Sequence, residues 1–265
     1  DEISPFSINL SKGIIGSLYL AAVLLVIGIK PIEMRSFLFL GVSGLLGITL
    51  GDTFFFISLM HLGPRLSSLT GALTPVFIAL SSVLFLNERP SFLAWVGIFL
   101  TVSGVTWMLW ERVPGKEIIK NKALGITYRL LSIVCLTAGV ILTKIGVESV
   151  SPIQATFIRL SWSVFGLILW GCLNHQLKNW LVPFKNPHLL KKVSLVVLIV
   201  VFGGFWLSLA ALKYMDAAIA SALNSTAPLF ILPMVAIMLK EKITIQAVLG
   251  AAIAACGVAL IFMGG

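Results

Sequence analysis

The chain has 265 residues, of which 58% are hydrophobic and only 11% charged, and its formal net charge is +9 at pH 7. Soluble domains carry about 25% charged residues, so a chain this apolar cannot cover itself with polar surface and we expect lipid to be its solvent. The basic residues fall in short clusters between apolar runs and form no continuous basic face, which argues against nucleic-acid binding.

Charges and turn residues divide the chain into apolar segments of the length that crosses a bilayer. A transmembrane helix needs about 20 mainly apolar residues for a hydrocarbon layer of about 30 Å. In chain order we expect such helices at 6–29, 36–60, 66–86, 91–110, 123–147, 151–173, 193–213, 217–239 and 243–263. The connections at 111–122 and 174–192 are the longest and are too short for a soluble domain. The sequence therefore predicts an all-α, multi-pass protein of the cell membrane with about nine transmembrane helices.

Two stretches of the chain repeat one another in order. The first pairs are separated by 147 residues and the later ones by 153, because the 174–192 connection is longer than its counterpart. The matching pairs are Ser4-Pro5 with Ser151-Pro152, Lys12 with Arg159, Pro75 with Pro228, Glu88 with Glu241, Gly97 with Gly250, and Gly104 with Gly257. Ordered matches of this kind indicate a duplication. We expect a first repeat at 1–110 and a second at 123–265.

The duplication also makes a prediction about the helix at 123–147. Its counterpart in the first repeat would lie before Asp1, so we expect the chain to be truncated at its N-terminus and the full protein to have ten helices, five in each repeat. A natural protein of nine helices is the alternative. Equivalent helices are separated by five crossings, an odd number, which predicts that the two halves lie in opposite orientations as an inverted repeat.

Several of these motifs resemble a known family. They are the Ser-Pro helix start with its internal basic residue (Ser151 to Arg159), the proline-bearing helices that end in Asn87-Glu88-Arg89-Pro90 and Lys240-Glu241-Lys242, and the Gly-x₆-Gly helices. Together they resemble two EamA repeats of the drug/metabolite transporter superfamily, the first without its opening helix. The resemblance implies ten helices, a cavity between the halves, and export or exchange of small metabolites such as amino acids without ATP. Small multidrug exporters of this superfamily carry an acidic residue in their first helix. That residue has no match here, because the equivalent helix of the first repeat would precede Asp1 and its counterpart at 123–147 contains no carboxylate.

Three charged residues within predicted helices are candidates for a substrate site. Charges in the bilayer core cost about 2.5–3.5 kcal/mol on insertion scales and are therefore expected to serve a function. Lys12 and Arg159 occupy equivalent repeat positions and could hold an anionic group of a substrate, or could instead reach the headgroups or fix the repeat interface. Asp52 has Phe205 at its equivalent position; it could couple transport to protons or could simply pair with Lys12.

Aromatic and polar residues near helix breaks are the remaining substrate-binding candidates. Trp206 and Tyr214 could line a cavity, although aromatic residues in such helices more often serve packing. Asn224 and Thr74 lie near Pro228 and Pro75, where a helix kink could free backbone groups for a substrate. Small polar residues at these places could equally allow close helix packing.

The other polar residues predict no catalytic chemistry. Glu88 and Glu241 adjoin basic residues at helix ends and are expected to form ion pairs in loops. The three histidines and three cysteines have no ligand-like spacing, and no nucleophile motif or phosphate-binding loop occurs, so we expect no metal, no cofactor and no enzyme activity. The membrane orientation stays open, because the distribution of basic loop residues and the family resemblance favour opposite topologies.

The sequence thus predicts a secondary active transporter that exports small, amino-acid-like metabolites by alternating access. Its partners would be a small-molecule substrate and the lipid bilayer, with coupling to a proton or solute gradient. The alternatives are a channel or a non-transporting structural or receptor protein of the membrane, and, with less support, a membrane-embedded enzyme.

Overall fold

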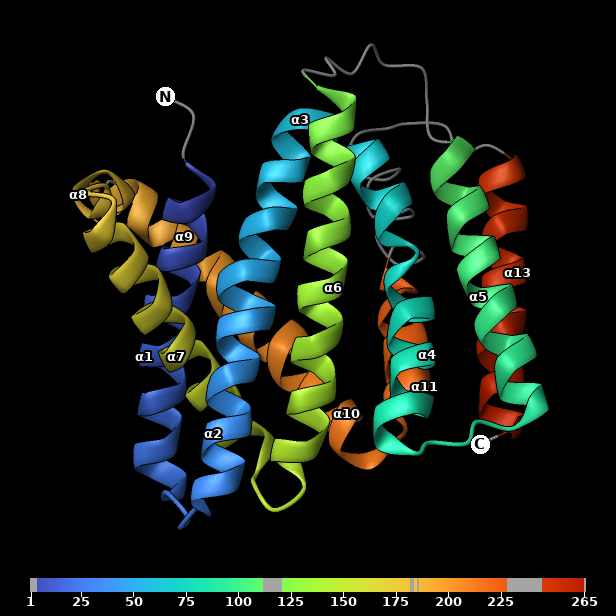
Figure 1. Cartoon of the computed structure of the whole chain (residues 1–265), viewed down its shortest axis with the longest axis horizontal. Coiled ribbons are helices and arrows are strands. Elements are labelled where there is room, and N and C mark those ends of the chain that lie inside the picture. The colour runs from blue at the N-terminus through green and yellow to red at the C-terminus, as the bar shows by residue number, and fades with distance from the viewer. Residues whose placement is uncertain (1–3, 112–120, 182–183, 185, 228–244, 265) are drawn as a thin grey trace. The chain divides into compact units, whose positions relative to one another are not determined.

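The computed structural model describes residues 4–111, 121–181, 184, 186–227 and 245–264, and the regular elements among them are helices (Figure 1). Within these described residues, seven helices are long and apolar enough to cross a membrane, and Phe92–Met108 is a shorter apolar helix. The seven are Phe6–Ile27, Met34–Gly63, Leu66–Leu86, Lys122–Val147, Pro152–Leu173, Pro187–Tyr214 and Ile245–Gly264. The all-α, multi-pass membrane architecture is therefore as predicted.

The helix boundaries differ from the prediction at two places. The helix expected at 36–60 runs on to Gly63, where a φ of 77° interrupts it. The helix expected at 193–213 already begins at Pro187, because Asn186 caps its first turn. The helix expected at 217–239 lies mostly outside the described residues, which contain its first part as α11 (Ala217–Asn224).

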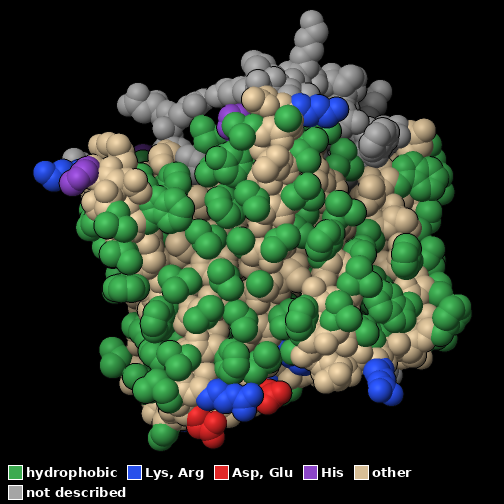
Figure 2. All heavy atoms as spheres, viewed as in Figure 1, with side chains coloured by type: hydrophobic (Ala, Val, Ile, Leu, Met, Phe, Trp, Pro, Cys, Tyr) green, Lys and Arg blue, Asp and Glu red, His purple; other side chains and the backbone are tan. Residues whose placement is uncertain are grey.

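The described residues form two compact units, each built from two separate stretches of the sequence. The first unit comprises 1–57 and 134–214, and the second comprises 58–133 and 215–265. In the space-filling view, hydrophobic side chains cover the helices of both units, while charged side chains gather near the helix ends (Figure 2). This distribution is what a lipid environment favours for the middle of each helix.

The first unit contains the residues that the sequence singled out for their charge. Its elements are α1 (Pro5–Ile27), α2 (Met34–Ser43), the π-helical segment η1 (Gly44–Asp52), the start of α3 (Thr53–Gly71), the second half of α6 (Lys122–Val147), α7 (Pro152–Leu173), α8 (Leu177–Trp180), α9 (Pro187–Ile199), the π-helical segment η3 (Val200–Trp206) and α10 (Leu207–Tyr214).

The two Ser-Pro motifs both begin helices of this unit. Ser4 has extended backbone geometry and Pro5 is the first residue of α1. Ser151 has the same geometry, and its hydroxyl accepts a hydrogen bond from the backbone N–H of Gln154. A proline is favourable at this position because the first N–H groups of a helix have no partner within the helix.

The two Ser-Pro helices, α1 and α7, pack against each other in antiparallel directions. A methyl group added at Gly13 would lie 2.7 Å from Cγ2 of Val164, and one added at Gly16 would lie 3.1 Å from Cδ1 of Leu160. Towards the other end, Phe6 contacts Trp170, with 6.3 Å between the ring centroids. Glycine is needed at these crossings because a larger side chain would push the helices apart.

The second unit contains the rest of α3, α4 (Thr74–Leu86), α5 (Phe92–Glu111), the first half of α6, α11 and α13 (Ile245–Gly264). Helices α5 and α13 carry the two Gly-x₆-Gly motifs and pack along each other. A methyl group at Gly97 would lie 2.6 Å from the carbonyl oxygen of Gly257, and one at Gly104 would lie 2.6 Å from that of Gly250. The first glycine of each motif thus meets the second glycine of the other, so these helices also run antiparallel.

Glu88 caps a helix of the second unit and does not form the ion pair that the sequence predicted. Its carboxylate is buried, and it accepts hydrogen bonds from the backbone N–H groups of Ala217 at 2.8 Å and Ala218 at 3.4 Å. Those groups open α11 and have no partner within the helix, so a carboxylate there satisfies them and also faces the positive end of the helix dipole. Glu241 lies outside the described residues.

Candidate membrane-embedded ionic site

Lys12, Asp52 and Arg159 come together inside the first unit, within helices long enough to span a membrane. Lys12 lies in the third turn of α1 and forms an ion pair with Asp52, the last residue of η1. The two side chains are 12% and 19% exposed. Arg159 of α7 lies within electrostatic reach of the same carboxylate. We call these three residues the ionic cluster.

Arg159 is held against η1 by backbone packing. Gly44 lies so close to the carbonyl oxygen of Arg159 that no larger residue fits there without a shift of the backbone. A methyl group at Gly47 would lie 3.4 Å from Nη2 of the guanidinium, which places this group directly on the η1 surface. The Nε of Arg159 is buried and has no hydrogen-bond partner among the residues that the structure describes.

The π-helical segment η1 offers a backbone group to α1. The buried amide of Asn9 donates hydrogen bonds to the carbonyl oxygen of Ile48 at 2.9 Å and to Oγ1 of Thr53 at 3.2 Å. π-helical turns change the regular hydrogen-bond pattern and occur often at functional sites. The Asn9 oxygen Oδ1 accepts no hydrogen bond from any described residue. Two buried polar atoms therefore lack a protein partner near the cluster, which is typical of a place where water or a ligand binds.

Lys12 also contacts an aromatic ring. Its ammonium lies 5.1 Å from the centroid of the Phe205 ring, which η3 supplies. An ammonium at this distance is attracted to the ring face. Phe205 packs in turn on the buried core that includes Ile15 and Leu160. The sequence indicated Phe205 only as the expected counterpart of Asp52 and gave no signal of its contact with Lys12.

The remaining candidates are placed elsewhere. Trp206 follows Phe205 in η3 and is half-buried. Tyr214 is 77% exposed at the end of α10, where the ammonium of Lys213 lies 6.0 Å from its ring centroid. Thr74 begins α4 and Asn224 ends α11, both in the second unit, where these two helices pack together. The structure thus joins the three charged candidates and does not join Tyr214 to them.

One further observation bears on the chemistry of the site. Among the described residues, no group of three or more His, Cys, Asp or Glu side chains is arranged to hold a metal ion.

Arg129, to which the sequence assigned no role, is buried in the second unit, where its Nε donates to the carbonyl oxygen of Ser67 at 3.0 Å. Its guanidinium fills the space beside Gly71 at the end of α3. A buried arginine with backbone partners is well suited to fixing a helix break.

Comparisons with known proteins agree with this architecture. The chain is 29% identical over 152 residues to Protein LicB of Haemophilus influenzae, an alignment that covers 55% of this chain and about half, 51%, of LicB. A crystal structure of a protein with 18% identical residues superposes with a TM-score of 0.76 over 99% of this chain and 88% of the other, which shows a shared fold. The model of the EamA-like transporter family matches residues 1–110 and 123–263. This chain therefore belongs to the EamA-like transporter family.

Proposed function

We propose that the chain is a secondary active transporter that exports small, amino-acid-like metabolites by alternating access, with the ionic cluster as its substrate or coupling site. The observation that carries this proposal is the meeting of Lys12, Asp52 and Arg159 within membrane-spanning helices. Three charges in such a place are costly, and they do not extend to the helix ends where headgroups would solvate them. Their placement favours a function in transport.

The charge balance of the cluster favours an anionic group on the substrate. Two cations share one carboxylate, which leaves one positive charge in excess. The unpartnered Nε of Arg159 is a donor that a substrate carboxylate could use. An amino-acid-like substrate carries such a carboxylate, and its ammonium group could bind the unpartnered Oδ1 of Asn9. Asp52, which is near both cations, is the candidate for the coupling role.

The helix pairs within each unit support alternating access. Repeat-equivalent helices lie side by side and antiparallel in both units: α1 with α7, and α5 with α13. Antiparallel contacts between equivalent helices are what a two-fold axis in the membrane plane generates, and transporters with this symmetry bind substrate between their repeats. The contacts therefore support the inverted repeat that the sequence predicted.

Transport in proteoliposomes tests the proposal. Purified protein would be reconstituted and tested for saturable uptake or counterflow with a panel of labelled amino acids, carboxylic acids and amines, with and without a proton gradient. Lys12→Ala combined with Arg159→Ala is expected to abolish transport of the carboxylate-bearing substrate. The matched control removes two exposed cations of α9, Lys191→Ala with Lys192→Ala, and is expected to transport normally.

Two outcomes would contradict the proposal. Full transport by the Lys12 and Arg159 double variant would exclude a role of these cations in the substrate site. Flux that rises linearly with substrate concentration and responds to no gradient would indicate a channel. Size-exclusion chromatography of each variant would show whether a loss of transport reflects a loss of the fold.

A further inference from the structure

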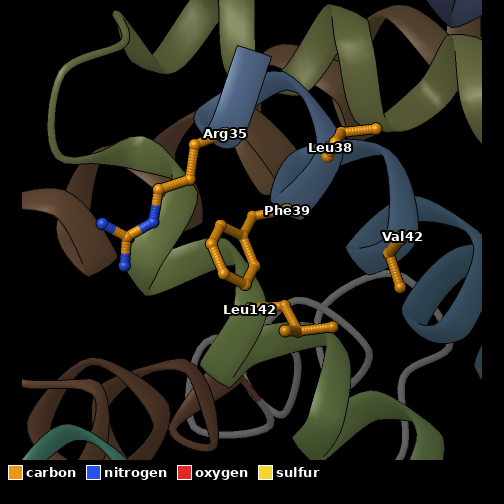
Figure 3. A pocket seen from close by; sticks show the side chains of 5 residues that line it. All are labelled: Arg35, Leu38, Phe39, Val42 and Leu142. Atoms are coloured by element: carbon orange, nitrogen blue, oxygen red, sulfur yellow. The ribbon is translucent and has the colours of Figure 1, made fainter. Parts of the chain in front are cut away.

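A pocket on the first unit lies between α2 and α6, apart from the ionic cluster (Figure 3). Its volume is about 560 Å³, and it is lined by Arg35, Leu38, Phe39, Val42 and Leu142. The four α2 residues have helical spacing and share one face of that helix, while Leu142 faces them from α6. Figure 3 shows Arg35 and Phe39 extending from α2 to the same side, with Leu142 reaching in from α6. We call this space the α2–α6 pocket.

The walls of the α2–α6 pocket are mainly apolar side chains, and the pocket opens at the surface of the unit. Four of its five lining residues are apolar. Leu38 and Val42 are 49% and 42% exposed on a helix that is part of a membrane span. A hydrocarbon surface of this kind in a bilayer is in contact with acyl chains, so an acyl chain is the occupant that matches the walls.

Arg35 supplies the polar end of the pocket. It is the second residue of α2, where the chain enters the span. Its guanidinium lies 5.6 Å from the centroid of the Phe39 ring and has no hydrogen-bond or ion-pair partner among the described residues. The Phe39 ring holds the guanidinium beside the pocket, and the N–H donors of the guanidinium stay available to an anion.

The neighbouring charges leave this end of the unit positive. Hydrogen bonds place the loop before α2, the turn after α6 and the end of α10 together: Gln154 donates to the Lys30 carbonyl oxygen, and Lys213 donates to that of Val150. The charged residues at this end are Lys30, Glu33, Arg35, Lys144, Glu148 and Lys213. Neither Glu33 nor Glu148 pairs with Arg35, and the cations outnumber the carboxylates.

We propose that the α2–α6 pocket binds an anionic phospholipid, whose phosphate contacts Arg35 and whose acyl chain lies along Leu38, Phe39, Val42 and Leu142. Basic groups beside apolar clefts between transmembrane helices are suited to such headgroups. The guanidinium forms paired hydrogen bonds with phosphate oxygens, while the hydrocarbon walls exclude a free phosphate ion. This inference does not depend on the proposed transport function.

Native mass spectrometry of the full chain tests this inference. Protein would be extracted from vesicles that contain phosphatidylcholine and phosphatidylglycerol in equal amounts, and the retained lipids would be counted. Wild-type protein is expected to retain phosphatidylglycerol preferentially. Arg35→Gln is expected to reduce this retention about fivefold, which corresponds to the loss of one basic contact with an anionic lipid. Arg89→Gln, an equal charge change at an exposed loop of the second unit, is the control and is expected to have no effect.

A second variant separates the acyl-chain contact from the charge. Leu142→Trp would fill the pocket and leave Arg35 in place, and it is expected to lower the retention of both lipids at this site. Equal phosphatidylglycerol retention by wild type and Arg35→Gln would overturn the proposal, as would an equal loss in Arg35→Gln and Arg89→Gln. Displacement of the retained lipid by inorganic phosphate alone would also overturn it, because the pocket would then bind the ion and not the lipid.

Discussion

The ammonium of Lys12 lies 5.1 Å from the centroid of the ring of Phe205, the residue that the predicted repeat pairs with Asp52. Lys12 therefore contacts both an anion, Asp52, and an aromatic ring, Phe205. Arg159 lies within electrostatic reach of the same carboxylate. Among the described residues of the cluster, two cations thus share one carboxylate, which leaves an excess positive charge.

The shared carboxylate predicts unequal effects of removing the two partners of the ion pair. Asp52→Asn leaves Lys12 and Arg159 without a counter-charge and is expected to lower the free energy of unfolding by about 3–5 kcal/mol. Lys12→Met leaves Arg159 near Asp52 and is therefore expected to lower the free energy of unfolding by clearly less than Asp52→Asn does. Thermal unfolding of the purified variants in detergent measures both. Equal losses of stability would show that Arg159 does not compensate Asp52.

Moving the carboxylate to the other repeat tests the geometry of the cluster directly. Phe205→Asp would place an acidic group on η3, at a residue whose ring Lys12 already contacts. In the Asp52→Asn background this change is expected to restore part of the lost thermal stability, because Lys12 regains a counter-charge. Phe205→Asn in the same background has a similar size without the charge and serves as the control. A rescue of equal size by both variants would mean that packing, and not charge, limits the stability of the cluster.

The sequence predicted the spans and the charged candidates because both depend on local composition. Apolar runs of sufficient length define the helices, and a charged residue within such a run stands out from its neighbours. The sequence could not show whether Lys12 pairs with Asp52 or reaches the headgroups. The two residues are 40 positions apart, and the outcome depends on how α1 packs on η1. Nor did it indicate the π-helical turns of η1 and η3, whose residues are ordinary for a transmembrane helix.

The glycines show in the same way that the sequence does not reveal which residues contact a neighbouring helix. The spacing of Gly97, Gly104, Gly250 and Gly257 makes them stand out in the sequence, but only the structure shows that the two motifs meet each other. Gly203 and Gly204 are no less conspicuous in the sequence, yet a methyl group added at either would have no atom of the described chain within 4 Å. Spacing alone does not distinguish a crossing point from an open helix face.

This contrast predicts opposite effects of the same substitution. Gly97→Ala places a methyl group 2.6 Å from the carbonyl oxygen of Gly257, so α5 and α13 must separate, at a cost of about 1–3 kcal/mol in the free energy of unfolding. Gly203→Ala meets no obstacle and is expected to be neutral or to stabilise by up to about 1 kcal/mol, because alanine favours helical backbone. Thermal unfolding of the two single variants makes the comparison. A loss of stability in Gly203→Ala comparable to that of Gly97→Ala would contradict the assignment of the crossing.

Glu88 provides a prediction about a contact that joins segments far apart in the sequence. Its carboxylate accepts from the N–H groups of Ala217 and Ala218, so Glu88→Ala leaves the start of α11 without its cap and is expected to cost about 1–2 kcal/mol. Glu88→Gln keeps one oxygen acceptor and loses the attraction of the negative charge to the helix dipole, so its effect is expected to lie between those of wild type and alanine. Glu33→Ala is the matched control, since Glu33 stands at the N-cap of α2 but makes no side-chain cap hydrogen bond. Amide hydrogen exchange at α11 should rise in Glu88→Ala and stay unchanged in Glu33→Ala. Unchanged exchange in Glu88→Ala would show that the N-terminus of α11 is held by other contacts.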